Sequence, residues 1–380
     1  MEIVNHMITV GGLLFRSLSI LFVIMIIIFV HEFGHYLIGR LCGIKAAVFS
    51  LGFGPKVLEY RDRQGTQWCL SLIPLGGYVK FIGDGEDVSS SQSSPEVKGS
   101  LANAHTWKKA LTVFAGPLFN ILFTVIILTF FFFMYGRVAI EPIVGSLEKD
   151  SPAFQAGLGL GDRFIEMDGQ RIESFEDLMN YVTLHGKDPI EFKIERMGQI
   201  ITKVITPKLI ERDDGLGNRI QESMIGVGAP VDPNNQARLD PAYIKHIHYD
   251  FIRAMEEASK RTTFIVTQTV FFIGRLIGGK EDHCGISGPS RIAKIAWKVS
   301  ETGFVSLLNF TAFLSISVGL INLFPLPPLD GGHLLFHLLE VLTGGTVSAK
   351  IRTIVFRLGF FVLLCFMSFA FVNDYFCWFG

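Results

Sequence analysis

Two histidines and a glutamate form the motif in this sequence that is best suited to chemistry. The stretch "HEFGH" places His31 and His35 four residues apart, with Glu32 beside the first. Residues four apart share one face of a helix, so both imidazoles can bind one zinc ion while Glu32 acts on a water molecule. The alternative is a pair of interfacial histidines with a snorkelling glutamate. The apolar run before His31 weakens it, because ionisable groups inside an apolar helix are costly and mark functional sites.

Asp330 is the leading candidate for a third ligand. It stands in "NLFPLPPLDGGHLL", directly after the uncharged run 304–329. A catalytic zinc takes three protein ligands and keeps one position open, so a carboxylate at the end of an apolar span could complete the site. Asp330 could instead cap a helix. His333 and His337 are rival ligands in the same stretch.

The composition is that of a membrane protein rather than a soluble enzyme. Of the 380 residues, 49% are hydrophobic and only 18% are charged, and the mean hydropathy is +0.41. The net charge of −1 and the absence of a basic arm give no indication of a nucleic-acid partner. The cysteines are odd in number and form no CxxC pair, so they indicate neither a disulfide framework nor a thiolate metal site.

Four apolar segments are long enough to cross a lipid bilayer, which requires about 20 helical residues. They lie at about 8–41, 110–136, 304–329 and 354–372. The first has no small-residue cleavage site after it and continues into His31, so we interpret it as a retained helix rather than a signal peptide.

The polar region between the first two spans is predicted to be rich in β-structure. Its runs "AAVFSLGFG" and "WCLSLIPLGGYVKFIG" mix glycine and proline with β-forming residues, which favours strands and turns. These runs are apolar for a solvent-exposed loop, so we expect the region to associate with the membrane surface. An edge strand from "LIPLGGYVKF" could receive an extended peptide by β-strand addition.

The region after the second span resembles a PDZ domain in the order of its parts. Ser151 and Pro152 can start a short helix, Gly157 can end it, and Asp168-Gly169 suits a tight hairpin turn. A helix is expected from Ser174, and the alternation in "IEFKIER" and "IITKVIT" predicts two more strands. A generic small αβ domain is the alternative.

These observations predict a polytopic α-helical membrane protein with four transmembrane helices, a membrane-associated β-rich loop and one extracytoplasmic PDZ-like αβ domain. The expected boundaries are 1–42 for the first helix, 43–107 for the β-rich loop, 108–137 for the second helix, 138–225 for the PDZ-like domain, 226–302 for a linker and amphipathic helix, 303–340 for the third helix with LDGG, and 341–380 for the fourth helix.

Lysine and arginine near the ends of the spans predict the orientation. They flank 43–107 and also lie between the third and fourth spans, at Arg40, Lys45, Lys108, Lys109, Lys350, Arg352 and Arg357. Both regions are therefore expected in the cytoplasm, with the PDZ-like domain on the other side. The basic stretch "RIAKIAWKVS" argues against this, but its amphipathic spacing suits a helix lying along the outer membrane face.

Taken together, the motifs resemble the site-2 protease family of zinc intramembrane metalloproteases, and most closely its bacterial regulator-of-sigma-E protease branch. The resemblance rests on "HEFGH", on "LDGG" after "NLFPLPP", and on a PDZ-like domain between the second and third helices. It extends to "FGPKVLEYRDRQGTQWCLSLIPLGGYVKF" and "FAGPLFN", and so covers nearly the whole chain. The chain departs from the best-known member of that branch in having one recognisable PDZ domain rather than two.

The resemblance implies zinc as cofactor, with Glu32 as catalytic acid and base. It implies three metal ligands, namely His31, His35 and Asp330. It further implies that Asn322 and Pro325 hold the substrate strand and that Asn120 lies near the site and contacts substrate.

The implied substrates are transmembrane segments of single-pass proteins, such as an anti-sigma factor already trimmed by a site-1-type protease, and also remnant signal peptides. The implied location is the bacterial inner membrane, with several spans in the lipid bilayer and the PDZ-like domain in the periplasm. Two other functions stay open: a non-catalytic PDZ scaffold, which would not need the general base Glu32, and a metal transporter, which would show more ionisable groups in the second and fourth helices than this chain has.

Overall fold

A computed structural model of the chain describes residues 2–83, 99–213, 219–232, 235–278, 288–345 and 347–379. The chain divides into two compact units. The first contains 1–130, 255–266 and 287–372, and the second contains 131–254, 267–286 and 373–380.

Within the described ranges, four helices are long and apolar enough to cross a membrane, as the sequence predicts. They are α1 (Glu2–Leu41), α2 (Thr106–Tyr135), α7 (Phe304–Asn322) and α9 (Ala349–Phe379). Long apolar runs with few charges favour this structure, because only a helix or a closed barrel satisfies its backbone hydrogen bonds in lipid.

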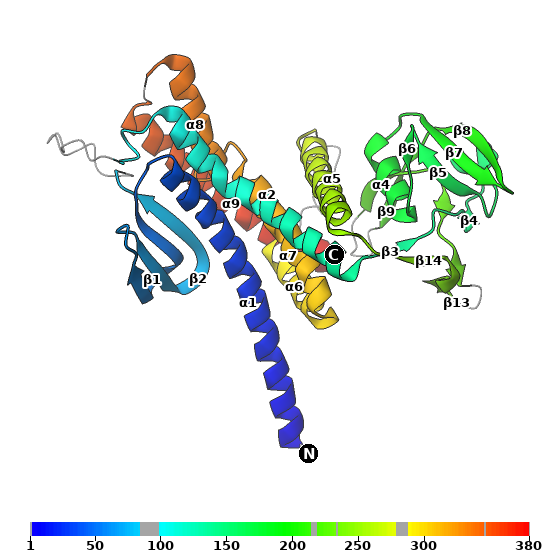
Figure 1. Cartoon of the computed structure of the whole chain (residues 1–380), viewed down its shortest axis with the longest axis horizontal. Helices are drawn as coiled ribbons and strands as arrows, with labels where there is room; N and C mark the ends of the chain where they lie inside the picture. The colour runs from blue at the N-terminus through cyan, green and yellow to red at the C-terminus, as the bar shows by residue number, and fades with distance from the viewer. Residues whose placement is uncertain are drawn as a thin grey trace. The chain divides into compact units, whose positions relative to one another are not determined.

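The β-rich region forms one long antiparallel hairpin, which lies beside α1 in Figure 1. Its strands are β1 (Ala46–Arg61) and β2 (Gln67–Phe81), and their register shifts at several bulges. Phe49 and Phe81 are buried with Tyr36 of α1 in one apolar cluster. The Tyr36 hydroxyl donates to Asp62 in the hairpin turn at 3.3 Å. The hairpin is therefore fixed to the same helix that carries the HExxH motif.

The helix α2 packs closely on both α1 and α7 through small residues. A Cβ added to Gly34 of α1 would overlap the carbonyl oxygen of Ala115 on α2. On the other side, the Thr124 hydroxyl donates to the carbonyl of Ala312, and the Ser315 hydroxyl donates to the carbonyl of Asn120, both at 3.0 Å. These contacts hold α2 between the two helices.

The span expected at 303–340 is not one helix. The helix α7 ends at Asn322, and a separate helix α8 (Asp330–Thr343) begins at Asp330. The connection contains a cis peptide bond between Pro327 and Pro328. Proline supplies no N–H and disfavours helix in the residue before it, which accounts for the break. Asp330 therefore stands at the N-terminus of a helix, where a carboxylate is favoured by the helix dipole.

The region 226–302, expected to be a linker and an amphipathic helix, contains the amphipathic helix but also a second helix where a linker was expected. The region holds two helices, α5 (Phe251–Ile277) and α6 (Pro289–Thr302), preceded by short strands. In the first unit, α6 is attached to α1 by an ion pair between Arg16 and Glu301. The Arg16 guanidinium also lies 5.6 Å from the centre of the Trp297 ring.

In the second unit, the PDZ-like domain is built around a four-stranded sheet in the order β6-β5-β7-β8. Its strands and helices are β4 (Ser146–Leu147), α3 (Pro152–Gln155), β5 (Arg163–Met167), β6 (Gln170–Arg171), α4 (Phe175–His185), β7 (Ile190–Arg196) and β8 (Gln199–Ile205). The expected turn at Asp168-Gly169, with positive φ at both residues, is present, as are helix starts capped by Ser151 and Ser174.

The domain continues beyond the expected boundary at 225. The strand β11 (Val227–Gly228) pairs with β4, and Val227 belongs to the buried core. Further strands are β9 (Lys208–Asp213), β10 (Arg219–Met224), β12 (Val231–Asp232) and β13 (Asn235–Leu239), followed by the 3-10 helix η1 (Pro241–Tyr243).

Finally, β3 (Arg137–Ile140) pairs with β14 (Ile244–Ile247) to form a two-stranded ribbon at the base of the domain. The residue before this ribbon, Gly136, has a φ of 68° and approaches the carbonyl of Ile247 too closely for any Cβ to fit. The strands by which the chain enters and leaves the domain, β3 and β14, therefore lie side by side.

Candidate metal centre

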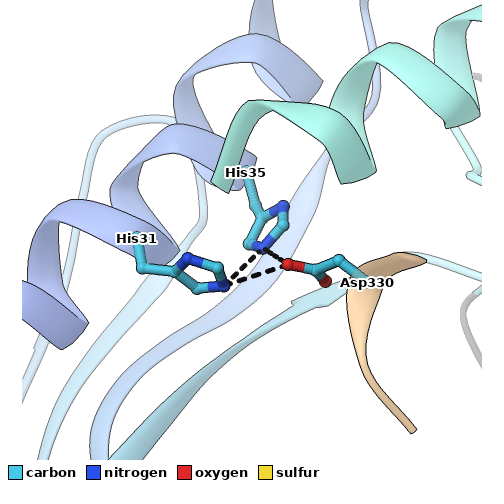
Figure 2. Close-up of side chains that lie close together, drawn as sticks. All are labelled: His31, His35 and Asp330. Atoms are coloured by element: carbon cyan, nitrogen blue, oxygen red, sulfur yellow. Dashed lines mark hydrogen bonds and ion pairs between the residues drawn. The ribbon is translucent and has the colours of Figure 1, made fainter. Parts of the chain in front are cut away.

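Three side chains from two helices converge on one point. Figure 2 shows His31 and His35 on successive turns of α1, with Asp330 facing both from the start of α8. The two Nε2 atoms lie 3.3 Å apart. Oδ2 of Asp330 lies 3.1 Å from the first and 3.4 Å from the second. The structure therefore brings together all three ligands expected from the sequence.

The arrangement fits a zinc ion. With metal–ligand bonds of about 2.0–2.1 Å, a tetrahedral site separates its ligand atoms by about 3.3 Å, which matches the observed triangle. Oδ2 of Asp330 is buried and accepts no hydrogen bond. Lone pairs gathered this closely repel one another unless a cation lies between them. Two histidines and one carboxylate form a donor set that catalytic zinc uses.

The site is shielded but not closed. The side chains of His31 and His35 are 10% and 11% exposed, and that of Asp330 is 18% exposed. Three protein ligands leave the fourth position of a tetrahedral ion for water or substrate, as in catalytic rather than structural zinc sites.

Glu32 is not one of the converging ligands. It is half-buried beside the strand β2, where a Cβ built on Gly77 would lie 3.0 Å from Cγ of Glu32. The hairpin therefore positions this carboxylate next to the triad while leaving it outside the ligand set.

The rival ligands lie elsewhere. The His333 ring packs on Phe356 of α9, with ring centroids 4.9 Å apart. Nδ1 of His337 lies 3.3 Å from Glu340. Neither histidine belongs to the metal-binding group found in the described residues.

The other expected site residues have different surroundings. Asn322 is the last residue of α7, and Pro325 is exposed in the connection to α8. Asn120 on α2 is fully buried, with its amide nitrogen 3.2 Å from Nδ1 of His31.

The sequence reasoning missed two residues of α2 that shape the site. The carbonyl of Thr112 lies 2.9 Å from Nδ1 of His35. Gly116 leaves the space that the His35 imidazole occupies, because a Cβ there would overlap that ring. The glycine in "FAGPLFN" was a signal that could have been used, since a glycine inside a helix often marks a close approach.

The chain is similar along nearly its whole length to proteins that are named as zinc metalloproteases. The profile of Peptidase family M50 matches residues 19–366. A relative from Bartonella henselae named as a zinc metalloprotease is 74% identical over 358 residues, covering 94% of this chain and 100% of the relative. A relative from Brucella suis with the same kind of name is 42% identical, with 94% of each chain covered. Metalloprotease MmpA of Caulobacter vibrioides is 30% identical, with 96% of each chain covered.

Two solved PDZ domains of SdrC-like proteins match part of the chain. The domain from Listeria monocytogenes is 21% identical and covers 24% of this chain and 86% of its own, with a TM-score of 0.20. The domain from Listeria innocua is 25% identical and covers 23% and 92%, with the same TM-score of 0.20.

The family profile spans most of the chain and includes both parts of the metal centre, the HExxH motif on α1 and Asp330 on α8. The chain therefore belongs to Peptidase family M50, the site-2 protease family, and is a zinc metalloprotease.

Proposed function

We propose that this metalloprotease is an intramembrane endopeptidase that cleaves the transmembrane segments of single-pass membrane proteins. One observation carries the proposal: His31 and His35 lie inside the apolar helix Phe15–Leu41, which is long enough to cross a bilayer. A hydrolytic site is placed at this depth when the bond to be cut is also there.

The chemistry divides between the metal and Glu32. Zinc in such a site lowers the pKa of a bound water to about 7 and polarises a carbonyl as a Lewis acid. Glu32 accepts the proton of the attacking water and passes it to the leaving amine. The carboxylate can do this because it stands beside the triad without being a ligand, against the strand β2.

Substrate binding is assigned to the surfaces around the triad. A helical substrate hides its carbonyls in its own hydrogen bonds, so it must unfold locally before cleavage. The hairpin β1–β2 offers strands for β-addition. Asn322 and Pro325 lie in the irregular connection that leads to Asp330, where non-helical backbone can contact an extended peptide.

The proposed setting is the bacterial inner membrane, with the hairpin at the cytoplasmic face and the PDZ-like domain in the periplasm. The lysines and arginines near the ends of the apolar helices support this orientation, and the relatives above come from bacteria. Suitable substrates are single-pass proteins of the anti-sigma type, first trimmed by a site-1-type protease, and remnant signal peptides.

The test is the variant Glu32→Gln, reconstituted in vesicles with a single-pass substrate. We expect loss of proteolysis with retention of about one zinc per chain, since Glu32 is outside the ligand triangle. His35→Ala is the matched control and should lose both zinc and proteolysis. Full cleavage by Glu32→Gln would sink the proposal. Zinc flux into vesicles without any cleavage by the wild type would favour a transporter, and neither activity would favour a scaffold.

A further inference from the structure

The two metal-binding histidines each direct their second ring nitrogen at α2. Nδ1 of His35 lies 2.9 Å from the backbone carbonyl of Thr112. A carbonyl can only accept, so Nδ1 of His35 carries the proton and its Nε2 keeps a free lone pair for the metal. The tautomer of His35 is thereby fixed by its neighbour.

Nδ1 of His31 faces the side chain of Asn120 instead. The amide nitrogen of Asn120 lies 3.2 Å from it, while the amide oxygen, Oδ1, is buried and has no hydrogen-bond partner. An amide N–H donating to Nδ1 would place the proton of a neutral His31 on Nε2. That proton would point at Oδ2 of Asp330 and would occupy the position that a metal needs.

A half-turn of the Asn120 amide gives the buried oxygen a partner and moves the proton of His31 from Nε2 to Nδ1. The oxygen and nitrogen of an asparagine side chain have nearly the same shape, so their assignment follows from the hydrogen-bond network. With the oxygen toward His31, Nδ1–H donates to Oδ1 of Asn120, and the orphaned oxygen is satisfied. This orientation is the one that the metal-binding tautomer of His31 requires, because an acceptor must then face Nδ1–H.

We propose that Asn120 is a positioning residue of the metal centre, whose side-chain oxygen accepts Nδ1–H of His31 and holds the tautomer in which Nε2 binds zinc. This role differs from the substrate contact that the family resemblance implies. Asn120 is 0% exposed, so it offers no surface to a peptide. Second partners of this kind orient metal-binding histidines and raise their basicity.

The backbone of Asn120 is held firmly enough for the task. Its carbonyl accepts hydrogen bonds from the hydroxyls of Thr124, one turn later on α2, and of Ser315 on α7, each at 3.0 Å. The side chain therefore starts from a fixed point between α1 and α7. Together, Thr112 and Asn120 make α2 the helix that sets both imidazoles.

Three variants of the full chain test this role. Asn120→Asp keeps an acceptor and removes the donor. Asn120→Leu removes both and keeps the approximate volume. Thr129→Val is the matched control, since it deletes a buried hydroxyl elsewhere on α2 that makes no hydrogen bond. Zinc affinity is measured by competition with a chelator, so cleavage of a substrate is not needed and the proposed proteolysis can fail separately.

We expect zinc affinity to fall about 10- to 100-fold in Asn120→Leu and to stay within about threefold of the wild type in Asn120→Asp and Thr129→Val. Thermal unfolding of each metal-free variant identifies those that are folded. Should Asn120→Leu fail to fold, Asn120→Asp decides alone. Loss of zinc binding in a folded Asn120→Asp variant would overturn the proposal, as would undiminished binding in a folded Asn120→Leu variant.

A second measurement reads the tautomer directly. Nitrogen-15 histidine spectra of the zinc-loaded wild type should show His31 bound through Nε2 with a slowly exchanging Nδ1–H. In Asn120→Leu that proton should exchange faster, because its acceptor is gone, while the Nδ1–H of His35 should be unchanged. A zinc-loaded wild type with His31 bound through Nδ1 would contradict the assigned role.

Discussion

Gly359 of α9 lies directly against Pro327, so closely that a Cβ at position 359 would overlap the proline's carbonyl oxygen. Pro327 is buried and lies three residues before Asp330. The connection is compact on its other side too, since a Cβ on Gly331 would overlap the carbonyl of Phe324. Asp330 of the metal-binding triad is therefore positioned by backbone packing, and α9 packs against the connection that leads to it.

Replacing Gly359 by alanine should weaken zinc binding by about tenfold or more, because the connection must shift and carry Asp330 with it. Overpacking of this kind costs about 1–3 kcal/mol, although alanine is intrinsically better in a helix than glycine by about 1 kcal/mol. Chelator competition and thermal unfolding measure the two effects. Gly345→Ala is the control, because its Cβ would meet open space. Equal zinc affinity in both variants would show that α9 has no such role.

Gly116→Ala should displace the His35 imidazole, since the added Cβ would occupy the volume of that ring. We expect a loss of zinc affinity of about tenfold or more and a matching loss of proteolysis. Gly12→Ala, on α1 with nothing within 4 Å of its Cβ, should leave both unchanged. A cobalt-substituted sample gives an independent reading through its absorption spectrum. An unaltered cobalt spectrum in Gly116→Ala would mean that α1 and α2 move apart without displacing the His35 imidazole from the metal.

Asp330→Asn should lower zinc affinity and activity far more than His333→Ala or His337→Ala. The reason is that, of these three residues, Asp330 lies close to the Nε2 atoms of His31 and His35. His333 instead packs on Phe356, and His337 contacts Glu340. Zinc content after dialysis against a weak chelator distinguishes the three variants. Metal loss in His333→Ala with metal retained in Asp330→Asn would mean that the third ligand is wrong.

The PDZ-like domain contains a buried carboxylate whose protonation should govern its local stability. Burial raises the pKa of Asp162, but two hydrogen bonds from Arg196, at 2.7 and 2.6 Å, and one from the amide of Gly159 hold that pKa below its ordinary value. A pKa that is lower in the folded state stabilises the fold above the unfolded pKa of about 3.9, and the contribution disappears as pH falls through the folded value.

Asp162→Asn should therefore destabilise the domain near neutral pH by about 1–3 kcal/mol, the range for losing a hydrogen bond to a charged group. The difference from the wild type should shrink below about pH 4. Hydrogen exchange of peptides from 144–205, compared between the two proteins at each pH, measures this. A difference that is the same at pH 7 and at pH 3 would show that the carboxylate charge is not responsible.

The three residues of the triad could be singled out from the sequence because their spacing is local or their setting is unusual, although the choice of Asp330 over His333 and His337 came from the family resemblance. His31 and His35 share a helix face at a separation of four, and Asp330 ends a long uncharged run. A helix start at Asp330 was one of the two expectations for that residue, but the expected span 303–340 did not separate α7 from α8. Periodicity shows which residues face inward along one helix, but not where a neighbouring helix begins.

The residues that position the triad could not be predicted from the sequence, for a different reason. Thr112 acts through a backbone carbonyl, which every residue has, so its role leaves no mark in the sequence. Gly116 and Gly359 are visible as helix glycines that mark close approaches, but the sequence does not show which group approaches them. The limit of the PDZ-like domain was misplaced because β11 and β4 are two-residue strands far apart in the chain. Strands this short show no alternation of polar and apolar residues, so only the pairing itself reveals them.

Because β3 and β14 pair with each other, the domain between them could be deleted without separating the two ends of the remaining chain. The chain enters at Gly136 and returns at Ile247, and these two residues are in contact. A very short linker between these two residues could therefore replace the whole domain. A deletion limited to residues 144–207 would instead leave Ile225 and Val227 of the buried core behind. Because the entry and exit points are adjacent, another domain could be inserted or exchanged at this position without changing the rest of the chain.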